Sequence, residues 1–317
     1  MNLNSVTKSL EKLKGVVKKT PLINSAIDSN CNLFLKPENL QVTGSFKIRG
    51  AYNKISSLSE EEKKKGIVAC SAGNHAQGVA LSAKLFGIKC VICMPKSTPN
   101  IKVENTKSHG ADVVLVDGVY DDAYNKALDF QKELGYTMIH PFNDEKVIEG
   151  QASIALEILD ECKDADIIVS SIGGGGLISG ISFAAKSINS RIKVYGVQAS
   201  GAPSMFASFA SGYVDKLDCV KTFADGIAVK EVGKITLGYV EKYVDDIVTV
   251  DDEEIANAIR QLYIKDNLIA EGAGAASLAA VLSNKIPDLS KDKKVICVIS
   301  GGNIDRTLLE KIINNGK

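Results

Sequence analysis

Short apolar runs alternate along the chain with stretches that have helical spacing. The runs are NLFLKP, GIVACS, KCVICMP, DVVLVD, TMIHP, DIIVSSI, KVYGVQA and KVICVIS (residues 32–37, 66–71, 89–95, 112–117, 137–141, 166–172, 193–199 and 294–300). Each has the length of a buried strand, and NHAQGVALSAKLFG and NIKVENTKSHG are examples of the helical stretches. This alternation predicts an α/β fold whose parallel sheets are built from right-handed strand–helix–strand units. Ligands bind such sheets at the carboxyl ends of strands, so candidate chemistry is expected there.

Two charged runs have the pattern of solvated helix starts. In SEEEKKKG (59–66), Ser59 and Glu62 predict a capping box and Gly66 predicts the helix end. The acids of DDEE (251–254) fall in the first turn of a second helix, IANAIRQLYIKD, where the helix dipole favours them. Because these acids would be hydrated, a metal site is not expected there. The i,i+4 ion pairs expected in the first run are Glu60–Lys64 and Glu61–Lys65.

Composition narrows the class of protein. The chain has 317 residues, 45% of them hydrophobic, and its 38 Lys and Arg balance 38 Asp and Glu. This balance disfavours a nucleic-acid polymer as partner, since phosphate contacts usually demand a basic excess. No apolar run approaches the length of a membrane span, and residues 1–15 predict an amphipathic helix, not a signal peptide. We therefore expect a cytoplasmic protein that binds no membrane.

The seven cysteines are scattered and do not suggest a disulfide framework. Cys90 and Cys93 have C-x-x-C spacing, but they lie in a predicted strand, where residues i and i+3 point to opposite faces. No second pair or nearby His completes a zinc site. We expect both to be buried core thiols.

A run of four glycines follows the apolar run DIIVSSI. Without side chains, the backbone N–H groups of Gly173, Gly174, Gly175 and Gly176 can converge on an anion at the start of the helix that follows. The run matches neither a dinucleotide fingerprint nor a nucleotide-triphosphate loop, because the third glycine and the Gly-Lys-Ser/Thr are missing. A single phosphate group fits best, and a tight structural turn is the alternative.

Three further strand ends carry candidate polar groups. Ser71 ends GIVACS, and Asn74 and His75 follow at a helix start. Together they suit a carboxylate, although Ser71 or Asn74 could simply cap that helix. Lys47 follows NLFLKP, beside Phe46, and could be a catalytic amine if its surroundings lower its pKa, to which Arg49 could contribute. A solvated surface lysine is the alternative. The third of these strand ends is SGGN (300–303), which begins at the last residue of KVICVIS; a simple strand-to-helix turn is its alternative.

Taken in order, these motifs resemble the threonine/serine dehydratases, which are pyridoxal 5'-phosphate enzymes of fold type II. The motifs are SFKIRGA (45–51), SAGNHAQG (71–78), GGGG (173–176) and SGGN (300–303), and they span nearly the whole chain. The related serine racemases share most of this pattern. The resemblance implies β-elimination of L-threonine and L-serine to 2-oxobutanoate or pyruvate and ammonia. A non-catalytic binder of a small phosphorylated ligand is the alternative from another class of protein.

The resemblance also implies residue roles. Lys47 would hold the cofactor as a Schiff base and carry the Cα proton, Phe46 would flank the ring, and Ser300 would face its pyridine nitrogen. Asn74 would bond the phenolic oxygen and, with Ser71 and His75, bind the substrate carboxylate. The implied phosphate-binding residues are Gly173, Gly174, Gly175, Gly176 and Leu177.

Domain organisation follows from the same resemblance. It implies a large cofactor-binding domain (1–58 and 144–317), in which a small domain (59–143) is inserted and closes over the substrate. A homodimer or homotetramer is implied as well. Because few residues follow Arg306, we expect the short catabolic form of dehydratase, which has no regulatory domain.

Three comparisons bear on the choice between a dehydratase and a racemase. Racemases place a second serine, an acid for the opposite face of the cofactor, where this chain has Ala72. They also tend to have Asn where this chain has Phe142, after His140 and Pro141. The Glu and Asp of the racemases' divalent-metal site correspond here to Gln198 and Ser204, which carry no charge. Whether this chain binds a metal is left open, and no metal ligand is named.

Overall fold

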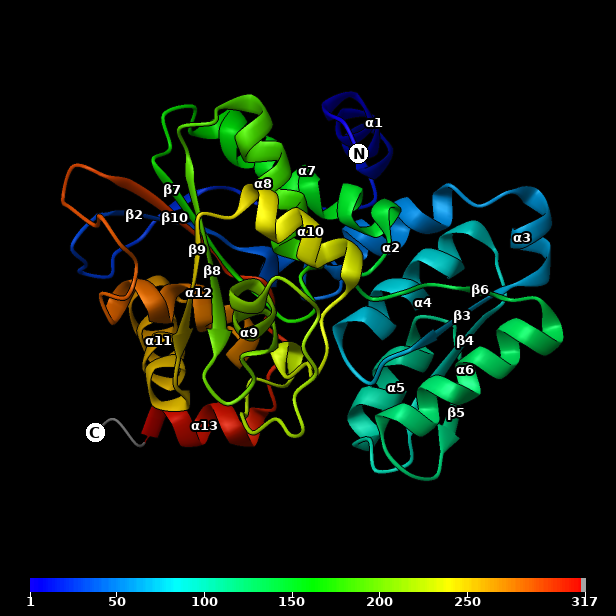
Figure 1. Ribbon diagram of the computed structural model, residues 1–317. Helices are drawn as coiled ribbons and strands as arrows, with labels where there is room; N and C mark the ends of the chain where they lie inside the picture. The colour runs from blue at the N-terminus through cyan, green and yellow to red at the C-terminus, as the bar shows by residue number, and fades with distance from the viewer. Residues whose placement is uncertain (315–317) are drawn as a thin grey trace.

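The computed structural model describes residues 1–314 and contains two β-sheets flanked by helices (Figure 1). The strands are β1 (Ile23–Asn24), β2 (Asn32–Lys36), β3 (Ile67–Cys70), β4 (Cys90–Pro95), β5 (Asp112–Val116), β6 (Thr137–Met138), β7 (Ile167–Ser171), β8 (Lys193–Ala199), β9 (Asp246–Val250) and β10 (Lys294–Val298). The α-helices are α1 (Leu3–Leu13), α2 (Lys47–Ser56), α3 (Glu60–Lys65), α4 (Asn74–Phe86), α5 (Asn100–Ser108), α6 (Tyr120–Leu134), α7 (Glu145–Glu161), α8 (Gly176–Ile188), α9 (Ser204–Ser211), α10 (Lys234–Tyr243), α11 (Asp252–Asp266), α12 (Gly272–Leu282) and α13 (Arg306–Asn314). Two 3₁₀ turns, η1 (Glu38–Leu40) and η2 (Asp225–Ile227), complete the elements.

The larger sheet has six strands in the order β1-β2-β10-β7-β8-β9, and only β1 is antiparallel to its neighbour. Side chains alternate along β10: Val295 and Cys297 join one buried cluster, whereas Ile296 and Val298 join another. Both faces of the sheet are therefore covered, as expected for parallel strands with apolar runs.

The smaller sheet is parallel throughout, in the order β5-β4-β3-β6. Its strands lie between residues 67 and 138, so this sheet is inserted between segments of the larger one. Cys90 and Cys93 of β4 are free, buried and in two different core clusters, which confirms that they are core thiols on opposite faces. Figure 1 shows the two sheets side by side, with α2 where they meet.

All eight apolar runs contain a strand, and two strands were not predicted. β1 has only two residues, too few to leave a pattern. β9 is an edge strand, DIVTV, in which Asp246 and Thr249 interrupt the apolar sequence and only Ile247 and Val250 are buried. Edge strands need less apolar surface than central ones, so their sequence signal is weaker.

The charged helix starts are largely as predicted. Ser59 and Glu62 form the capping box of α3, which Gly66 ends, and Asp251 forms another with Glu254 at the start of α11. Glu61 pairs with Lys65, but the predicted Glu60–Lys64 pair is wrong because Glu60 contacts Lys63 instead. On a helix surface the i+3 and i+4 positions are about equally close, so the sequence alone does not choose between them. None of the described helices is long and apolar enough to span a bilayer.

Candidate active site

Lys47 lies at the start of α2, between the two sheets. Its Nζ donates a hydrogen bond to the Pro141 carbonyl oxygen at 3.1 Å and lies 5.1 Å from the centre of the Phe46 ring. The N–H of Phe46 donates to the Ser300 carbonyl, which ties this segment to the end of β10. Burial lowers the pKa of Lys47 to about 8, partly opposed by the negative charge of Glu271. A lysine with such a pKa is unprotonated often enough near neutral pH to act as a nucleophile or base.

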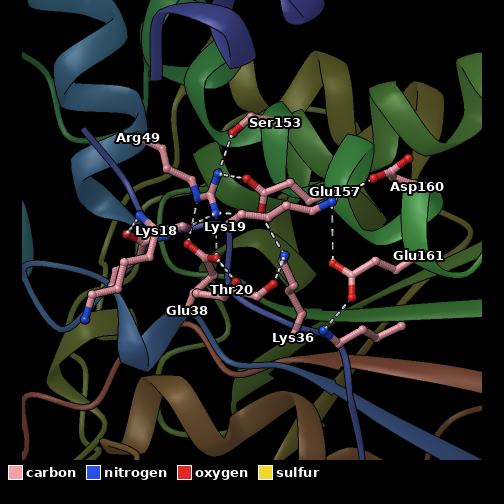
Figure 2. Close-up of polar contacts among 12 residues, drawn as sticks. Lys18, Lys19, Thr20, Lys36, Glu38, Arg49, Ser153, Glu157, Asp160 and Glu161 are labelled. Atoms are coloured by element: carbon pink, nitrogen blue, oxygen red, sulfur yellow. Dashed lines mark hydrogen bonds and ion pairs between the residues drawn. The ribbon is translucent and has the colours of Figure 1, made fainter. Parts of the chain in front are cut away.

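Arg49 does not contribute to this lowered pKa, so that expectation from the sequence is wrong. The guanidinium group is fully buried and binds the carboxylates of Glu38 and Glu157 (Figure 2). Its positive charge is therefore compensated locally, and burial is the main cause of the lowered Lys47 pKa.

Glycines allow close packing around α2. A Cβ on Gly150 of α7 would overlap the backbone of Arg49 and Gly50, and a Cβ on Gly78 of α4 would lie 3.2 Å from the Lys47 carbonyl oxygen. Helix α2 is thus wedged between α4, on the small sheet, and α7, on the large one. This packing fixes the position from which the Lys47 side chain extends.

The glycine run forms the turn from β7 into α8. Gly175 is the N-cap residue and has a left-handed backbone (φ 97°), which favours glycine. The backbone N–H groups of Gly173, Gly174 and Gly175 find no acceptor among residues 1–314, although Gly174 and Gly175 are buried. Buried N–H groups without acceptors are rare, and here they gather at the positive end of a helix. This arrangement fits a bound anion of phosphate size.

The walls of this glycine loop come from distant segments. A Cβ on Gly174 would overlap the Phe142 ring, and a Cβ on Gly175 would lie 2.6 Å from Met205 Cε and 2.8 Å from Thr236 Oγ1. The Thr236 hydroxyl donates to the Gly174 carbonyl at 2.6 Å. The loop is therefore enclosed, and side chains at these positions would collide with its walls.

The segment 140–143 connects Lys47 with the glycine loop. Its Pro141 carbonyl accepts the Lys47 hydrogen bond, and its Phe142 ring covers Gly174. His140 Nδ1 accepts the N–H groups of Phe142 and Asn143 at 3.3 and 2.9 Å, so this nitrogen carries no proton. Burial and the charge of Lys47 lower the pKa of His140 to about 4, which keeps the ring neutral near pH 7.

The SAGNH loop connects β3 and α4. Ser71 Oγ accepts the Gly73 N–H at 3.2 Å, and Gly73 is the N-cap of α4 without a side-chain cap, so neither Ser71 nor Asn74 caps the helix. The Asn74 amide donates to Glu271 Oε1 at 2.6 Å. His75 Nε2 donates to the Ile139 carbonyl at 2.8 Å, and burial lowers the pKa of His75 to about 3. The only ring proton of His75 is thus committed, and it can contribute to a carboxylate site through its backbone N–H.

Ser300 lies two residues beyond the end of β10, beside Ser171, which ends the neighbouring strand β7. The two hydroxyls are 3.3 Å apart, and Ser300 Oγ donates to the Ala273 carbonyl at 3.2 Å. Ser300 is buried, and its carbonyl accepts the Phe46 N–H described above. The SFKIRGA, GGGG and SGGN motifs of the sequence thus meet at adjacent strand ends.

Glu271, Thr236 and His140 were not predicted as site residues. Thr236 and His140 occur singly, with no flanking glycine that sets them apart, and only the fold brings them to the site. Glu271 directly precedes Gly272 and Gly274 at a helix start, a local signal that could have marked it. Of the positions compared with the racemase metal site, Gln198 accepts the Phe206 N–H and Ser204 is fully buried. No group of three or more His, Cys, Asp or Glu suited to a metal occurs within residues 1–314.

A sequence profile of the family described as "Pyridoxal-phosphate dependent enzyme" matches residues 13–301, and the chain belongs to this family. It is 50% identical over 319 residues to the L-threonine ammonia-lyase of Thermotoga maritima, an alignment that covers 100% of this chain and 79% of that protein. It is 44% identical over 313 residues to the catabolic L-threonine dehydratase TdcB of Escherichia coli K12, covering 98% and 95% of the two chains.

Solved structures support the fold class. Maize serine racemase superimposes with a TM-score of 0.93 at 35% identity, covering 99% of this chain and 97% of that chain. Processed threonine deaminase isoform 2 of Solanum lycopersicum gives 0.91 at 36% identity, covering 99% and 94%. The predicted fold type II architecture with two parallel-sheet units and the predicted cofactor, pyridoxal 5'-phosphate, are confirmed.

Proposed function

We propose that this enzyme deaminates L-threonine and L-serine by β-elimination, yielding 2-oxobutanoate or pyruvate and ammonia. One observation carries the proposal: Lys47 and the glycine loop lie on either side of segment 140–143, which contacts both. The lowered pKa of Lys47 suits a base, and the unpaired N–H groups of the loop suit a phosphate. Identity of 50% and 44%, over nearly all of this chain, to proteins named threonine ammonia-lyase and threonine dehydratase supports the choice of substrate.

The cofactor would be held between these groups. Lys47 would bind it covalently, Phe46 and Asn74 would contact its ring, and the glycine loop with Leu177 would bind its phosphate. Ser300 would face the pyridine nitrogen, and a hydroxyl, unlike a carboxylate, does not force that nitrogen to stay protonated. Bound pyridoxal phosphate supplies an electron sink for the pair left at Cα when its proton leaves.

The protein's own groups would orient the substrate and move protons. The N–H groups at the start of α4, with Ser71 and Asn74, would bind the carboxylate and direct Cα toward Lys47. The Lys47 amine would take the Cα proton, and the β-hydroxyl would leave with a proton as water. One water is then consumed to release ammonia, so the net change is amino acid to 2-oxo acid and ammonia.

We infer that residues 59–143 form the small domain and close over this site. Contacts that cross from it to the large-sheet unit include Asn74 to Glu271, and Lys102 Nζ to Asp225 Oδ2 at 2.6 Å. Closure would exclude water from the reacting groups. A homodimer or homotetramer, and a cytoplasmic location, remain predictions.

A serine racemase with dehydratase side activity is the second candidate, since the maize racemase has a closely similar fold. Ala72 argues against it, because an alanine cannot supply a proton to the face of the cofactor opposite Lys47.

The test is a coupled 2-oxo-acid assay with L-threonine and L-serine, run beside chiral analysis of serine. We expect keto acid from both substrates and loss of activity in Lys47→Ala. A holoenzyme that contains its cofactor but yields no keto acid from either amino acid would refute the proposal.

A further inference from the structure

Glu271 is a buried carboxyl group of the site that has no role in the proposed reaction. It is the N-cap residue of α12 and is 5% exposed. Its backbone N–H donates to the Gly301 carbonyl at 3.1 Å, and a Cβ on Gly301 would lie 2.5 Å from Glu271 Oε1. The carboxyl group is therefore held tightly against the SGGN motif. Burying a carboxyl group is costly, so the contacts that it makes are informative.

A chain of three hydrogen bonds of fixed direction ends at this carboxyl group. The Thr43 carbonyl can only accept, so the atom of Asn303 that lies 2.9 Å from it is the amide nitrogen Nδ2. The same nitrogen donates to Asn74 Oδ1 at 2.7 Å. Asn74 must then direct its own Nδ2 toward Glu271 Oε1, at 2.6 Å. Both ends of the Asn74 amide are thus assigned, and one N–H of Asn74 Nδ2 remains for a ligand.

This series of hydrogen bonds also joins the two halves of the molecule. Asn74 is the first residue of α4, which packs on the small sheet, whereas Asn303 and Glu271 belong to segments beside β10 of the large sheet. Without Glu271, the Asn74 side chain would lose one of the two large-sheet contacts that fix its orientation. Its remaining N–H would then point toward the ligand for only part of the time.

We propose that Glu271 is a positioning residue, which holds the Asn74 amide in the orientation that binds the cofactor. This inference rests on the cofactor contact of Asn74 in the proposed function. An oxygen acceptor at this position is sufficient for the role, and a negative charge is not required.

The electrostatic surroundings are consistent with this role. Burial and the charge of Asp225 raise the pKa of Glu271 to about 7, while Asn74, Lys102 and Lys47 oppose the shift. Near neutral pH the carboxyl group therefore carries a proton part of the time. Oε1 can accept the Asn74 hydrogen bond in either protonation state.

A pair of substitutions separates positioning from charge. Glu271→Gln keeps an oxygen acceptor of the same size and removes the titration, whereas Glu271→Ala removes the acceptor. Glu149→Gln is the matched control, because Glu149 is also a 5% exposed carboxylate, but it pairs with Lys146 of its own helix α7 and contacts no residue of this hydrogen-bond series. Cofactor affinity is measured by titrating the visible absorbance of each protein with pyridoxal phosphate, in the absence of amino acid.

We expect Glu271→Ala to weaken cofactor binding about tenfold, in line with the loss of one hydrogen bond to a buried group. Glu271→Gln and Glu149→Gln should stay within about threefold of wild type. If Glu271→Gln loses as much as Glu271→Ala, the charge is what matters and the proposal is wrong. Wild-type affinity in Glu271→Ala would also overturn it.

Asn303→Ala provides an independent test that leaves α12 intact. Asn303 anchors the other end of the Asn74 amide, so either substitution frees the same rotation. The double variant should therefore lose less affinity than the product of the two single losses. Multiplicative losses would indicate two unrelated structural effects and would contradict the proposal. Because no substrate is used, failure of the proposed deamination would leave these measurements unchanged.

Discussion

The guanidinium group of Arg49 forms two parallel hydrogen bonds with the carboxylate of Glu157, with Nη1–Oε1 and Nη2–Oε2 distances of 2.7 and 2.8 Å. It forms a second such pair with Glu38, through Nε and Nη2, and also donates to Ser153 (Figure 2). Lys36, fully buried, adds a further contact to Glu157. Two positive and two negative side chains are thus neutralised together beneath the helix that begins at Lys47.

Removing Arg49 is expected to destabilise the protein strongly. Arg49→Ala leaves the carboxylates of Glu38 and Glu157 buried with only part of their compensating charge, which typically costs about 3–5 kcal/mol. Urea denaturation of the holoenzyme measures the loss. Arg306→Ala is the control, because Arg306 pairs with Glu310 on the surface and is 91% exposed, where such pairs are worth less than about 1 kcal/mol. Equal losses in the two variants would contradict the interpretation.

The glycine loop is expected to tolerate no added methyl group at Gly174. A Cβ there overlaps the Phe142 ring, so Gly174→Ala must displace the segment that contacts Lys47, at a cost of about 1–3 kcal/mol. We expect weaker cofactor binding by absorbance titration.

Gly238→Ala is the matched control for Gly174→Ala. Gly238 lies inside α10 with no atom within 4 Å of an added Cβ, and alanine favours a helix by up to about 1 kcal/mol. This variant should be as stable as wild type or more so, with unchanged cofactor affinity. Unchanged affinity in Gly174→Ala would show that the loop is less tightly enclosed than described.

His140 is expected to make the fold sensitive to acid. Its pKa is about 4 in the folded protein against an ordinary value of 6.5, so the unfolded chain takes up the proton first. Stability is therefore lost as the pH falls from 6.5 toward 4, and at pH 5 the loss is about 2 kcal/mol. In addition to burial, the charge of Lys47 contributes to the lowered pKa of His140, and the charge of Asp144 opposes it. His75, whose own pKa is lowered to about 3, also takes up a proton when the chain unfolds in acid.

His140→Asn keeps an oxygen acceptor for the two backbone N–H groups but cannot titrate. The stability of wild type should fall more steeply than that of the variant between pH 7 and pH 5, as measured by urea midpoints. Parallel curves for the two proteins would mean that His140 does not titrate on unfolding in this range.

The sequence predicted the strands and the four motifs well because each is a local pattern. An apolar run bounded by glycine or a polar turn specifies a buried strand, and parallel strands bring their carboxyl ends to one edge. Contacts from isolated residues could not be predicted in this way. Phe142 and Glu271 reach the site only through the packing of α2, α7 and α12. The orientation of Arg49 also depended on distant carboxylates, and its spacing from Lys47 gave no indication of them.

Ala72 is expected to determine whether the enzyme can invert Cα. It follows Ser71, whose hydroxyl is engaged with the Gly73 N–H, and it packs against the core of the small sheet. If the cofactor face opposite Lys47 has no acid, a proton is removed and returned on one side only. Wild type should then convert L-serine to pyruvate with negligible D-serine.

Ala72→Ser adds a hydroxyl at this position and should yield measurable D-serine. A general acid typically contributes about 10²–10⁴-fold, so even imperfect placement of the serine leaves a detectable rate. Ala72→Gly is the control, because it changes the same position without adding a hydroxyl, and it should form no more D-serine than wild type. Chiral chromatography of serine after incubation measures all three proteins. Appreciable D-serine from wild type would show that Ala72 is not the deciding residue, and the racemase would then become the preferred function.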